Sequence, residues 1–168
     1  MSQLRLPFAS DGNESAPVAL VACVAGKRDS AARAAELYTS DWFRKARRYA
    51  ECHARAWHIL SARHGLLDPD EMIEPYEERL HPSDGRALYH WGWRVACQLL
   101  SRYPEPTTFV ILAGRTYRRH LLPMLRVKGD HETIVPMAGL GIGKQKRWLM
   151  GRPVEGARPA RTAGEAQW

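Results

Sequence analysis

Cysteine is scarce in this sequence, and the three cysteines stand far apart at positions 23, 52 and 97. Their odd number and wide spacing argue against a disulfide framework and against a CxxC zinc site. Long apolar runs are also missing, because no segment reaches the roughly 18 residues that a membrane-spanning helix needs. Residues 1–16 contain no continuous apolar signal core. We therefore expect a cytoplasmic protein that does not interact with membranes.

Acidic residues are fewer than basic ones: the sequence has 18 Asp and Glu but 25 Lys and Arg, which gives a formal net charge of +7. This excess favours an anionic partner such as nucleic acid, a nucleotide or phosphate. A basic surface that serves only solubility would give the same total, so the positions of the cations must decide. The histidines lack the spacing of metal ligands, and we predict neither a metal site nor a cofactor.

The length of 168 residues and the hydrophobic content of 45% suit one domain with a sizeable core. Residues 1–16 are polar and predict a flexible N-terminal arm. Residues 17–150 carry the pattern of a single α/β domain. Residues 151–168 are rich in Pro, Gly and Arg and predict a disordered tail.

Within this domain, short apolar runs alternate with longer segments of helical periodicity. Continuous apolar runs are typical of strands buried on both faces, and the alternation is typical of parallel sheets covered by helices. We predict a three-layer α/β/α fold with a mainly parallel sheet of four or five strands. The predicted strands are residues 17–23, 57–62, 107–114 and 132–139, and the predicted helices are residues 39–56, 81–103, 115–129 and 141–150.

Each predicted strand is followed by a glycine and at least one cation. In parallel sheets, ligands bind outside the carboxyl ends of the strands. Glycine lets backbone N–H groups approach a ligand closely, helix N-termini attract anions, and Arg or Lys completes such a site. We therefore predict one anion-binding cleft. The predicted substrate-binding residues are Cys23, Gly26, Ser61, Arg63, Tyr76, Gly114, Arg115, Tyr117, Gly141, Gly143 and Gln145.

Two of these segments allow an alternative interpretation. "AGLGIGKQ" is not a phosphate-binding Walker A loop, because Ala138 and Gln145 replace its first glycine and its Ser or Thr, and it could be only a tight turn. Cys23 could be a nucleophile or a small buried residue, and we favour a residue that lines the pocket. The other two cysteines and most tryptophans lie on helical patterns and predict core or rim packing.

A long polar connection after the second predicted strand, "HGLLDPDEMIEPYE", is rich in carboxylates. Long loops at this edge of a sheet often carry function, and a carboxylate near a cation can activate water or stabilise a cationic sugar. The alternative is that these carboxylates only solvate a surface loop. We predict that one carboxylate lies within reach of Lys27 or His64. The predicted catalytic residues are Lys27, Asp29, His64, Asp68 and Glu74.

A basic stripe runs along the first long helical segment, because Arg44, Arg47, Arg48 and Arg55 recur at helical spacing. This stripe could track the phosphates of a nucleic acid, and we predict that these four arginines bind it. The alternative is an ordinary solvated helix face.

The motifs "VACVAGKRD", "WHILSARHGLL", "FVILAGRTY" and "GLGIGKQ" together resemble a family of bacterial domains of unknown function over residues 18–150. His58 departs from that pattern, which usually has an aromatic residue there. More remotely, the Cys-x-x-x-Lys and Leu-Ser-Ala-x-x-Gly strand ends are similar to the core domain of archaeosine synthase and to uracil-DNA-glycosylase-like folds. These resemblances imply a base-binding pocket at the strand ends.

The cations, the strand ends and the resemblance together predict a nucleobase- or nucleotide-directed enzyme. A glycosylase-like or base-modifying reaction in the basic cleft is the favoured activity, with nucleic acid, a nucleotide or a nucleobase as the ligand. Two alternatives remain open: a nucleic-acid-binding module without catalysis, and an enzyme that acts on a small phosphorylated metabolite. The oligomeric state is not indicated by the sequence.

Overall fold

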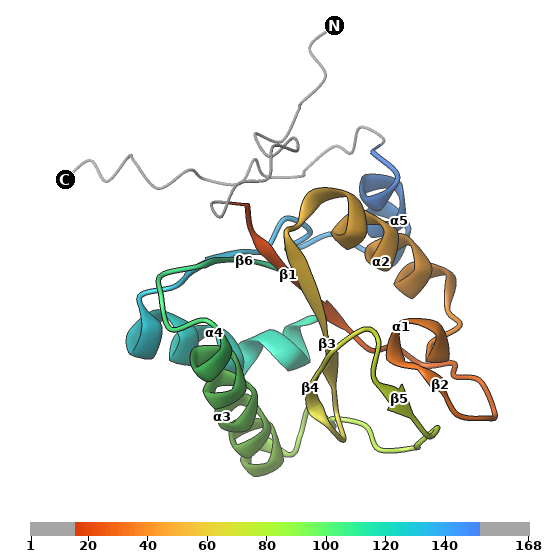
Figure 1. The fold of residues 1–168 in the computed structure, drawn as a ribbon, viewed down its shortest axis with the longest axis horizontal. Helices are drawn as coiled ribbons and strands as arrows, with labels where there is room; N and C mark the ends of the chain where they lie inside the picture. Colours follow the sequence, from red (N-terminus) through yellow and green to blue (C-terminus); the bar gives the residue numbers. More distant parts are fainter. Residues whose placement is uncertain (1–15, 152–168) are drawn as a thin grey trace, which may run out of the picture.

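Five strands form the central sheet, in the order β4-β3-β1-β6-β7 (Figure 1). In the computed structural model, which describes residues 16–151, β1 lies at the centre and runs parallel to both neighbours, while β7 adds to β6 in parallel and β4 returns antiparallel to β3. The strands are β1 (Val18–Ala22), β3 (Ala56–Ser61), β4 (Gly65–Leu67), β6 (Thr108–Leu112) and β7 (Glu132–Ile134). The predicted mainly parallel sheet is therefore confirmed.

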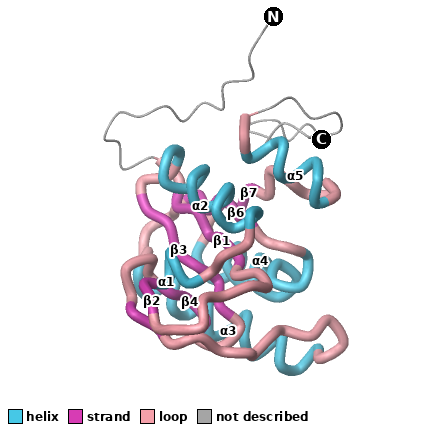
Figure 2. Tube along the Cα trace, turned by 90° about the vertical axis from the view of Figure 1, so that its right-hand side faces the viewer, coloured by secondary structure: helices cyan, strands magenta, loops and turns pink. Residues whose placement is uncertain are grey.

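Helices cover both faces of this sheet, which confirms the three-layer prediction. On one face lie α2 (Asp41–His53) and α5 (Ile142–Leu149), and on the other lie α3 (Gly85–Arg102) and α4 (Arg115–Gly129). In the view turned by 90°, α2 and α5 lie at the top and α3 at the bottom (Figure 2). This arrangement leaves the two ends of the strands as the edges at which a ligand can reach the sheet.

The alternation of side chains along β1 explains why this strand is apolar throughout. Val18 and Leu20 pack toward α3 and α4, whereas Ala19 and Val21 pack toward α2 and α5. All four side chains are buried, because successive residues of a strand point to opposite faces and both faces are covered. A polar residue at any of these positions would have to be buried without solvent.

Capping side chains set the starts of α2 and α3. Ser40 Oγ accepts a hydrogen bond from Phe43 N at 3.1 Å at the start of α2. Asp84 Oδ1 accepts one from Ala87 N at 2.9 Å at the start of α3. Each cap satisfies an N–H group that has no partner within its own helix.

The segment predicted to be a long polar connection contains further regular structure. After β3 the chain turns back at Gly65, whose φ of 76° is in the left-handed region that glycine adopts without strain, and forms β4. Leu67 then pairs with Ile59, two residues along the hairpin from the pair of Gly65 with Ser61. A second small sheet joins β2 (Ala32–Arg33) to β5 (Met72–Ile73), next to α1 (Ala34–Leu37).

Two further expectations are affected by the structure. Cys52 and Cys97 are exposed on α2 and α3, so their placement in the core was wrong, because both lie off the buried face of their helix. The predicted arm and tail, apart from the border residues 16 and 151, lie outside the described residues. In the described part of the chain, no helix combines the length and the apolar character needed to cross a membrane.

We expect acid to destabilise this fold, because it contains two buried histidines and one half-buried histidine. Burial lowers the pKa of His58, His64 and His131 below the ordinary value of 6.5. His131 Nδ1 also accepts a hydrogen bond from Thr107 N at 3.0 Å, which a proton on that nitrogen would break. A folded-state pKa below the unfolded one means that stability is complete above pH 6.5 and is lost as the pH falls through that value.

We therefore expect the free energy of unfolding, measured with urea, to fall steadily between about pH 7 and pH 5. The variant His131→Asn keeps an acceptor for Thr107 but removes one titrating group, and should show a weaker dependence on pH. A stability that stays constant over this range would contradict the prediction.

Candidate functional site

The point where the strand order reverses lies between β1 and β6. The chain leaves β1 toward β3 and leaves β6 toward β7, in opposite directions along the sheet. In open α/β sheets such a switch point leaves a crevice outside the carboxyl ends of the two strands. Cys23 follows β1 at this point, and Tyr117 lies in the first turn of α4, directly after β6. Cys23 Sγ and Tyr117 Oη are 3.1 Å apart, so these two side chains meet at the switch point.

Three hydroxyl groups meet beside this pair, and we refer to Tyr38, Ser61 and Tyr76 as the hydroxyl cluster. Tyr76 Oη lies 2.6 Å from Tyr38 Oη and 2.7 Å from Ser61 Oγ. All three residues are at most 4% exposed. The backbone N–H of His64 donates to Ser61 Oγ at 3.1 Å, which fixes this hydroxyl at the end of β3.

The hydroxyl cluster has one more proton than it uses internally. Its three O–H groups make two hydrogen bonds among themselves, so one O–H remains to be donated outside the cluster. Burial is the main cause that raises the pKa of Tyr38, Tyr76 and Tyr117 above the ordinary value for tyrosine. These phenols are therefore neutral at physiological pH and act as hydrogen-bond donors as well as acceptors.

Lys27 covers the hydroxyl cluster from the turn after β1. Its Nζ lies 4.5 Å from the ring centroid of Tyr76 and 5.9 Å from that of Tyr38. Backbone pairing holds this turn in place. Lys27 forms an isolated antiparallel β-bridge with Tyr38, and the carbonyl oxygen of Gly26 accepts a hydrogen bond from Thr39 N at 3.0 Å. Gly26 has a φ of 92°, which this turn requires and which other residues rarely adopt. The half-buried ammonium of Lys27 is thus positioned beside neutral phenols.

Trp91 and His64 complete this region, and Trp91 was not assigned a functional role from the sequence. Trp91 Nε1 donates to the carbonyl of Ser61 at 2.8 Å, and its ring lies 5.1 Å from that of Tyr117. The ring of His64 meets the ring of Tyr76 edge-on at 5.3 Å. Tyr38 was also missed, although it lies within the motif "ARAAELYTS", where a tyrosine beside a helix start could have drawn attention.

Of the predicted catalytic residues, Lys27 and His64 both contact Tyr76, but Asp68 lies elsewhere. Arg102 Nη2 donates to Asp68 Oδ2 at 2.9 Å, and His58 Nδ1 is 2.8 Å from Asp68 Oδ1. The hydrogen bonds from Arg102 are the main cause that lowers the pKa of the Asp68 carboxyl. No ion pair joins Asp68 to Lys27 or His64 within residues 16–151. The predicted proximity fails because β4 carries the chain from the carboxyl ends of the strands back toward His58.

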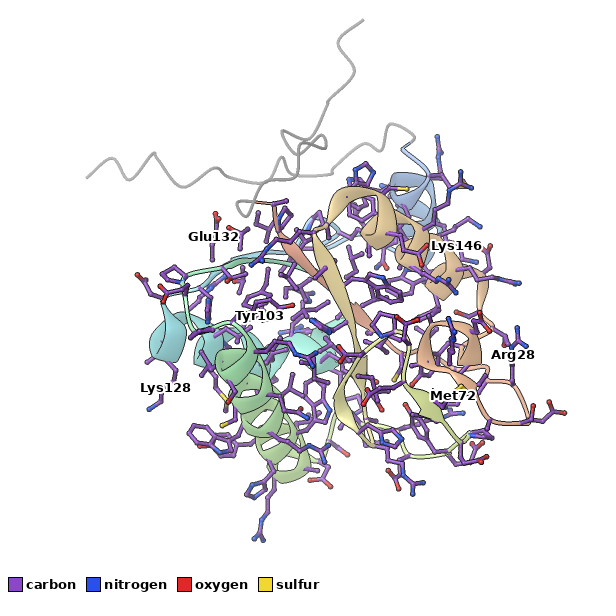
Figure 3. All side chains as sticks on the ribbon, in the orientation of Figure 1. Arg28, Met72, Tyr103, Lys128, Glu132 and Lys146 are labelled. Carbon is purple, nitrogen blue, oxygen red and sulfur yellow. The ribbon has the colours of Figure 1, made fainter. Side chains whose placement is uncertain are left out.

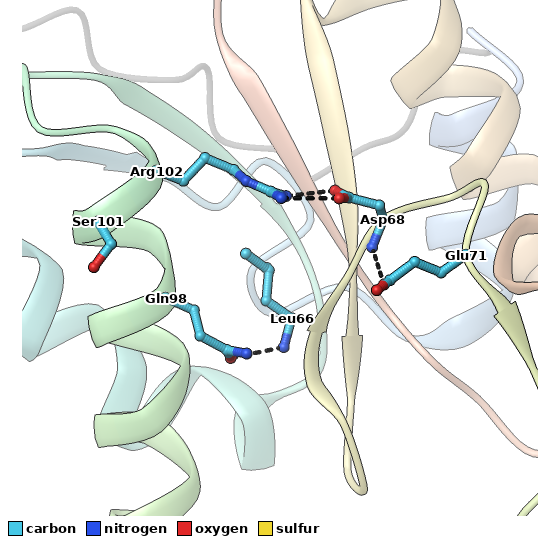
Figure 4. A pocket seen from close by; sticks show the side chains of 6 residues that line it. All are labelled: Leu66, Asp68, Glu71, Gln98, Ser101 and Arg102. Atoms are coloured by element: carbon cyan, nitrogen blue, oxygen red, sulfur yellow. Dashed lines mark hydrogen bonds and ion pairs between the residues drawn. The ribbon is translucent and has the colours of Figure 1, made fainter.

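The cavity beside Asp68 is separate from the hydroxyl cluster. It has a volume of about 410 Å³ and opens between β4 and α3 (Figure 4). Its lining residues are Leu66, Asp68, Glu71, Gln98, Ser101 and Arg102. The other two predicted carboxylates, Asp29 and Glu74, are exposed and form no ion pair within the described part of the chain. Their catalytic role stays a prediction.

The predicted anion-binding residues are only partly brought to the cluster. Arg63 lies 3.9 Å from Glu78 in an exposed pair. Gly114 caps the N-terminus of α4 and is followed by the exposed Arg115, at the carboxyl end of β6. These positions leave both arginines available at the same edge of the sheet, and their part in anion binding stays a prediction.

The turn that leads into α5 holds the remaining predicted substrate-binding residues. Gly141 caps α5, and Gly143 is exposed in its first turn. The side-chain amide of Gln145 links α5 to α2 and to the preceding turn. Its Oε1 accepts a hydrogen bond from Trp42 Nε1 at 2.9 Å, and its Nε2 donates one to Leu140 O at 2.7 Å. A ligand would have to compete with these bonds for the Gln145 side chain.

The predicted basic stripe is shorter in the structure than in the sequence. α2 ends at His53 because Ala54 is extended, so Arg55 lies beyond the helix, 5.6 Å from the ring of Tyr103. Arg47 Nε donates to Glu51 at 2.7 Å. Arg44 and Arg48 are exposed on α2. The predicted contact of these arginines with nucleic acid is reduced to a short helical surface and stays a prediction.

Comparison with known proteins agrees with the motifs that span the whole domain. Residues 18–151 match a family of unknown function, DUF6884. No curated protein and no solved structure matches the chain significantly. Among the described residues, no three or more His, Cys, Asp or Glu side chains are grouped to hold a metal ion. The match covers both the sheet and all the residues of the hydroxyl cluster, and the chain belongs to the DUF6884 family.

Proposed function

We propose that this protein is a nucleobase- or nucleotide-directed enzyme whose substrate binds at the strand ends around the hydroxyl cluster. The observation that carries the proposal is the position of Lys27 over Tyr76, beside a buried set of neutral hydroxyls at the switch point of the sheet. A site with a few fixed polar groups among aromatic rings at this point of an α/β sheet suits a flat heterocyclic ligand.

Each part of a nucleotide has a counterpart in this site. Hydroxyl groups that both donate and accept match the edge of a nucleobase. The ammonium of Lys27 and the arginines that follow β3 and β6 match a phosphate. The N-terminus of α4, which begins at the same edge, adds N–H groups and partial positive charge. This combination favours a ligand that has both a base and an anionic group.

Cleavage of a glycosidic bond, or another modification of the base, is the reaction class that these residues support. In such cleavage the C1′–N bond breaks, the base keeps the electron pair and takes up a proton, and water supplies a hydroxyl group to C1′. The spare O–H of the hydroxyl cluster would donate a hydrogen bond to the departing base. Lys27 would stabilise the negative charge that develops there. His64 is placed to relay a proton, since it contacts Tyr76.

A ligand screen by thermal unfolding tests this proposal. Free nucleobases, nucleosides and nucleotides are compared with inorganic phosphate and ribose 5-phosphate, which lack the base. At a concentration of 100 times its dissociation constant, a true ligand should raise the free energy of unfolding by about 2.7 kcal/mol. We expect at least one nucleotide to stabilise the protein more than both controls. Chromatography of the reaction mixture then shows whether a free or altered base forms.

The outcome of this screen separates the alternatives. If ribose 5-phosphate stabilises the protein as strongly as any nucleotide, the base is not recognised and an enzyme acting on a small phosphorylated metabolite replaces the proposal. If a nucleotide binds but no product forms from it or from the same base in an oligonucleotide, the protein is a binding module.

A further inference from the structure

Helices α3 and α4 contain no carboxylate. α3 has three arginines and α4 has five Arg or Lys residues, yet neither helix has an Asp or a Glu. α2, the helix that carries the basic stripe, instead pairs Lys45 with Asp41 and Arg47 with Glu51. α5 has no carboxylate either but only three cations, so among the described helices the α3–α4 side of the sheet carries the larger excess of positive charge.

Most cations of α3 and α4 are not neutralised by neighbouring side chains. Within residues 16–151, Arg102 is the one cation of these two helices that forms an ion pair, with Asp68. Seven others form no ion pair in this part of the chain, and they are Arg86, Arg94, Arg115, Arg118, Arg119, Arg126 and Lys128. Of these, Arg94 and Arg126 donate hydrogen bonds to Ala62 O and Thr133 Oγ1. Unpaired cations on adjacent helices repel one another, so an anionic partner would relieve this repulsion.

Two aromatic side chains are exposed among these cations. Tyr89 and Trp93 are 51% and 46% exposed, and their spacing of four residues places them on the same side of α3. This exposure differs from the core and rim packing expected for the tryptophans. Lys128 of α4 holds its Nζ 6.0 Å from the Trp93 ring centroid, and His120 of α4 meets Tyr89 edge-on at 6.2 Å. The two aromatic rings thus lie along the seam between the helices.

Close packing holds this seam together. Gly92 lies between the two aromatic residues in sequence, and a Cβ atom there would be 3.0 Å from His120 Cβ. The missing side chain lets α3 and α4 approach each other (Figure 1), so aromatic groups of α3 and cations of α4 share one surface. Lys128 extends from the outer side of α4, away from the sheet (Figure 3).

We infer that this surface, the α3–α4 face, binds single-stranded nucleic acid. Cations along a surface bind the phosphates, and exposed aromatic rings stack on bases that are not paired. A duplex offers the phosphates but not the base faces, and an acidic protein offers charge without a ring to stack. The combination on the α3–α4 face therefore favours a single strand.

The two helices that form this face also contact the strand-end site. Trp91 of α3 and Tyr117 of α4 both contact the strand-end site, and Arg94 Nη2 donates to the carbonyl of Ala62 near the end of β3 at 3.3 Å. A strand lying on the face would pass close to that site. Binding by the α3–α4 face does not depend on the proposed enzymatic function, because Arg115 is the one cation of these helices that the proposed phosphate site also uses.

Fluorescence anisotropy with the full chain tests this inference. The probes are labelled oligothymidine and oligouridine of about 15 nucleotides and a mixed-sequence duplex of the same length. We expect both single strands to bind more tightly than the duplex, with an affinity that falls steeply between about 50 and 200 mM salt. A preference between the DNA and RNA probes would identify the natural strand.

Variants with matched charge locate the binding surface. Arg86 is exposed three residues before Tyr89, on the same side of α3. Arg86→Glu combined with Lys128→Glu should reduce the slope of log K against log salt by about 1.4, because two phosphate contacts are lost. Arg44→Glu combined with Arg48→Glu makes the same change of net charge on α2, the competing surface predicted from the sequence. If the α3–α4 face is the binding surface, this variant should have a much smaller effect, because the neighbouring Lys45 and Arg47 are already paired with Asp41 and Glu51. Trp93→Ala should weaken binding about tenfold, the loss of one stacked base, whereas Trp93→Phe should retain most of the affinity.

Three results would overturn the inference. One is an equal or larger loss of affinity in the α2 variant, which would place the nucleic acid on α2. Another is equal binding of duplex and single strands with no effect of Trp93→Ala, which would leave only nonspecific charge. The last is the absence of binding at low salt. All these measurements report binding without turnover, so they fail or succeed independently of the ligand screen.

Discussion

Replacing Lys27 by methionine is expected to abolish the ligand-dependent rise in melting temperature while the unliganded protein stays folded. Methionine keeps an unbranched apolar side chain over the ring of Tyr76 but removes the ammonium group, which lies 4.5 Å from that ring. The stability lost with the cation–π contact should be about 0.5–1 kcal/mol, because the residue is only half-buried. The loss for an anionic ligand is much larger, since its main counter-charge is gone.

The measurement is a thermal titration with the best nucleotide from the ligand screen. Lys45→Met is the matched control, because it removes the same charge from α2, where Lys45 pairs with Asp41. The control should keep the full ligand response. Lys27→Arg should recover part of it, since the charge returns in a different shape. An unchanged ligand response in Lys27→Met would show that the anionic group binds elsewhere.

Substituting Gly129 by alanine should cause a large loss of stability, because an added Cβ atom meets closer neighbours here than at the other described glycines. A Cβ atom at this position would be 2.3 Å from the ring of His131 and 2.4 Å from Leu100 Cδ2. The His131 ring is buried and tethered by Thr107 N, and Leu100 lies on α3, so neither can move without disturbing its surroundings. We expect a destabilisation of about 3 kcal/mol, the upper end of the range for overpacked cores.

Chemical denaturation of Gly129→Ala measures this cost, and Gly85→Ala provides the control. Gly85 begins α3 and has nothing within 4 Å of an added Cβ atom, so this change should be neutral or slightly stabilising. Similar stabilities for the two variants would mean that His131 and Leu100 have more freedom than their packing indicates.

Local patterns were sufficient to predict most of the secondary structure. The apolar run before "CVAGKRD" became β1, and Ser40 and Asp84 cap α2 and α3 where the cap signals stand. Such features depend on residues close in sequence, on continuous burial for a strand and on one side chain for a helix start. The same sequence also indicated Lys27, because a glycine and cations follow this strand, and its role in a site stays a prediction.

Tertiary structure alone decided which distant residues meet. Tyr38 and Tyr76 are separated by 38 positions and become neighbours only because the β2–β5 pair folds the connection back across the strand ends. Asp68 was expected in the same place, but the hairpin into β4 moves it next to Arg102. If a hairpin begins one residue earlier or later, every side chain of the following strand points to the opposite face of the sheet. No local sequence pattern determines where the hairpin begins.

The distribution of charge also depends partly on the sequence and partly on the tertiary structure. The sequence determined the net charge, the absence of Asp and Glu from residues 85–102 and 115–129, and the helical character of both segments. It did not determine that these helices pack side by side, with Tyr89 and Trp93 left exposed at their seam. That result depends on the order of strands in the sheet, which brings α3 and α4 to one face, and on Gly92, which lets them touch. A surface formed by two helices exists only after both have packed, because its cations and its aromatic rings come from different parts of the chain.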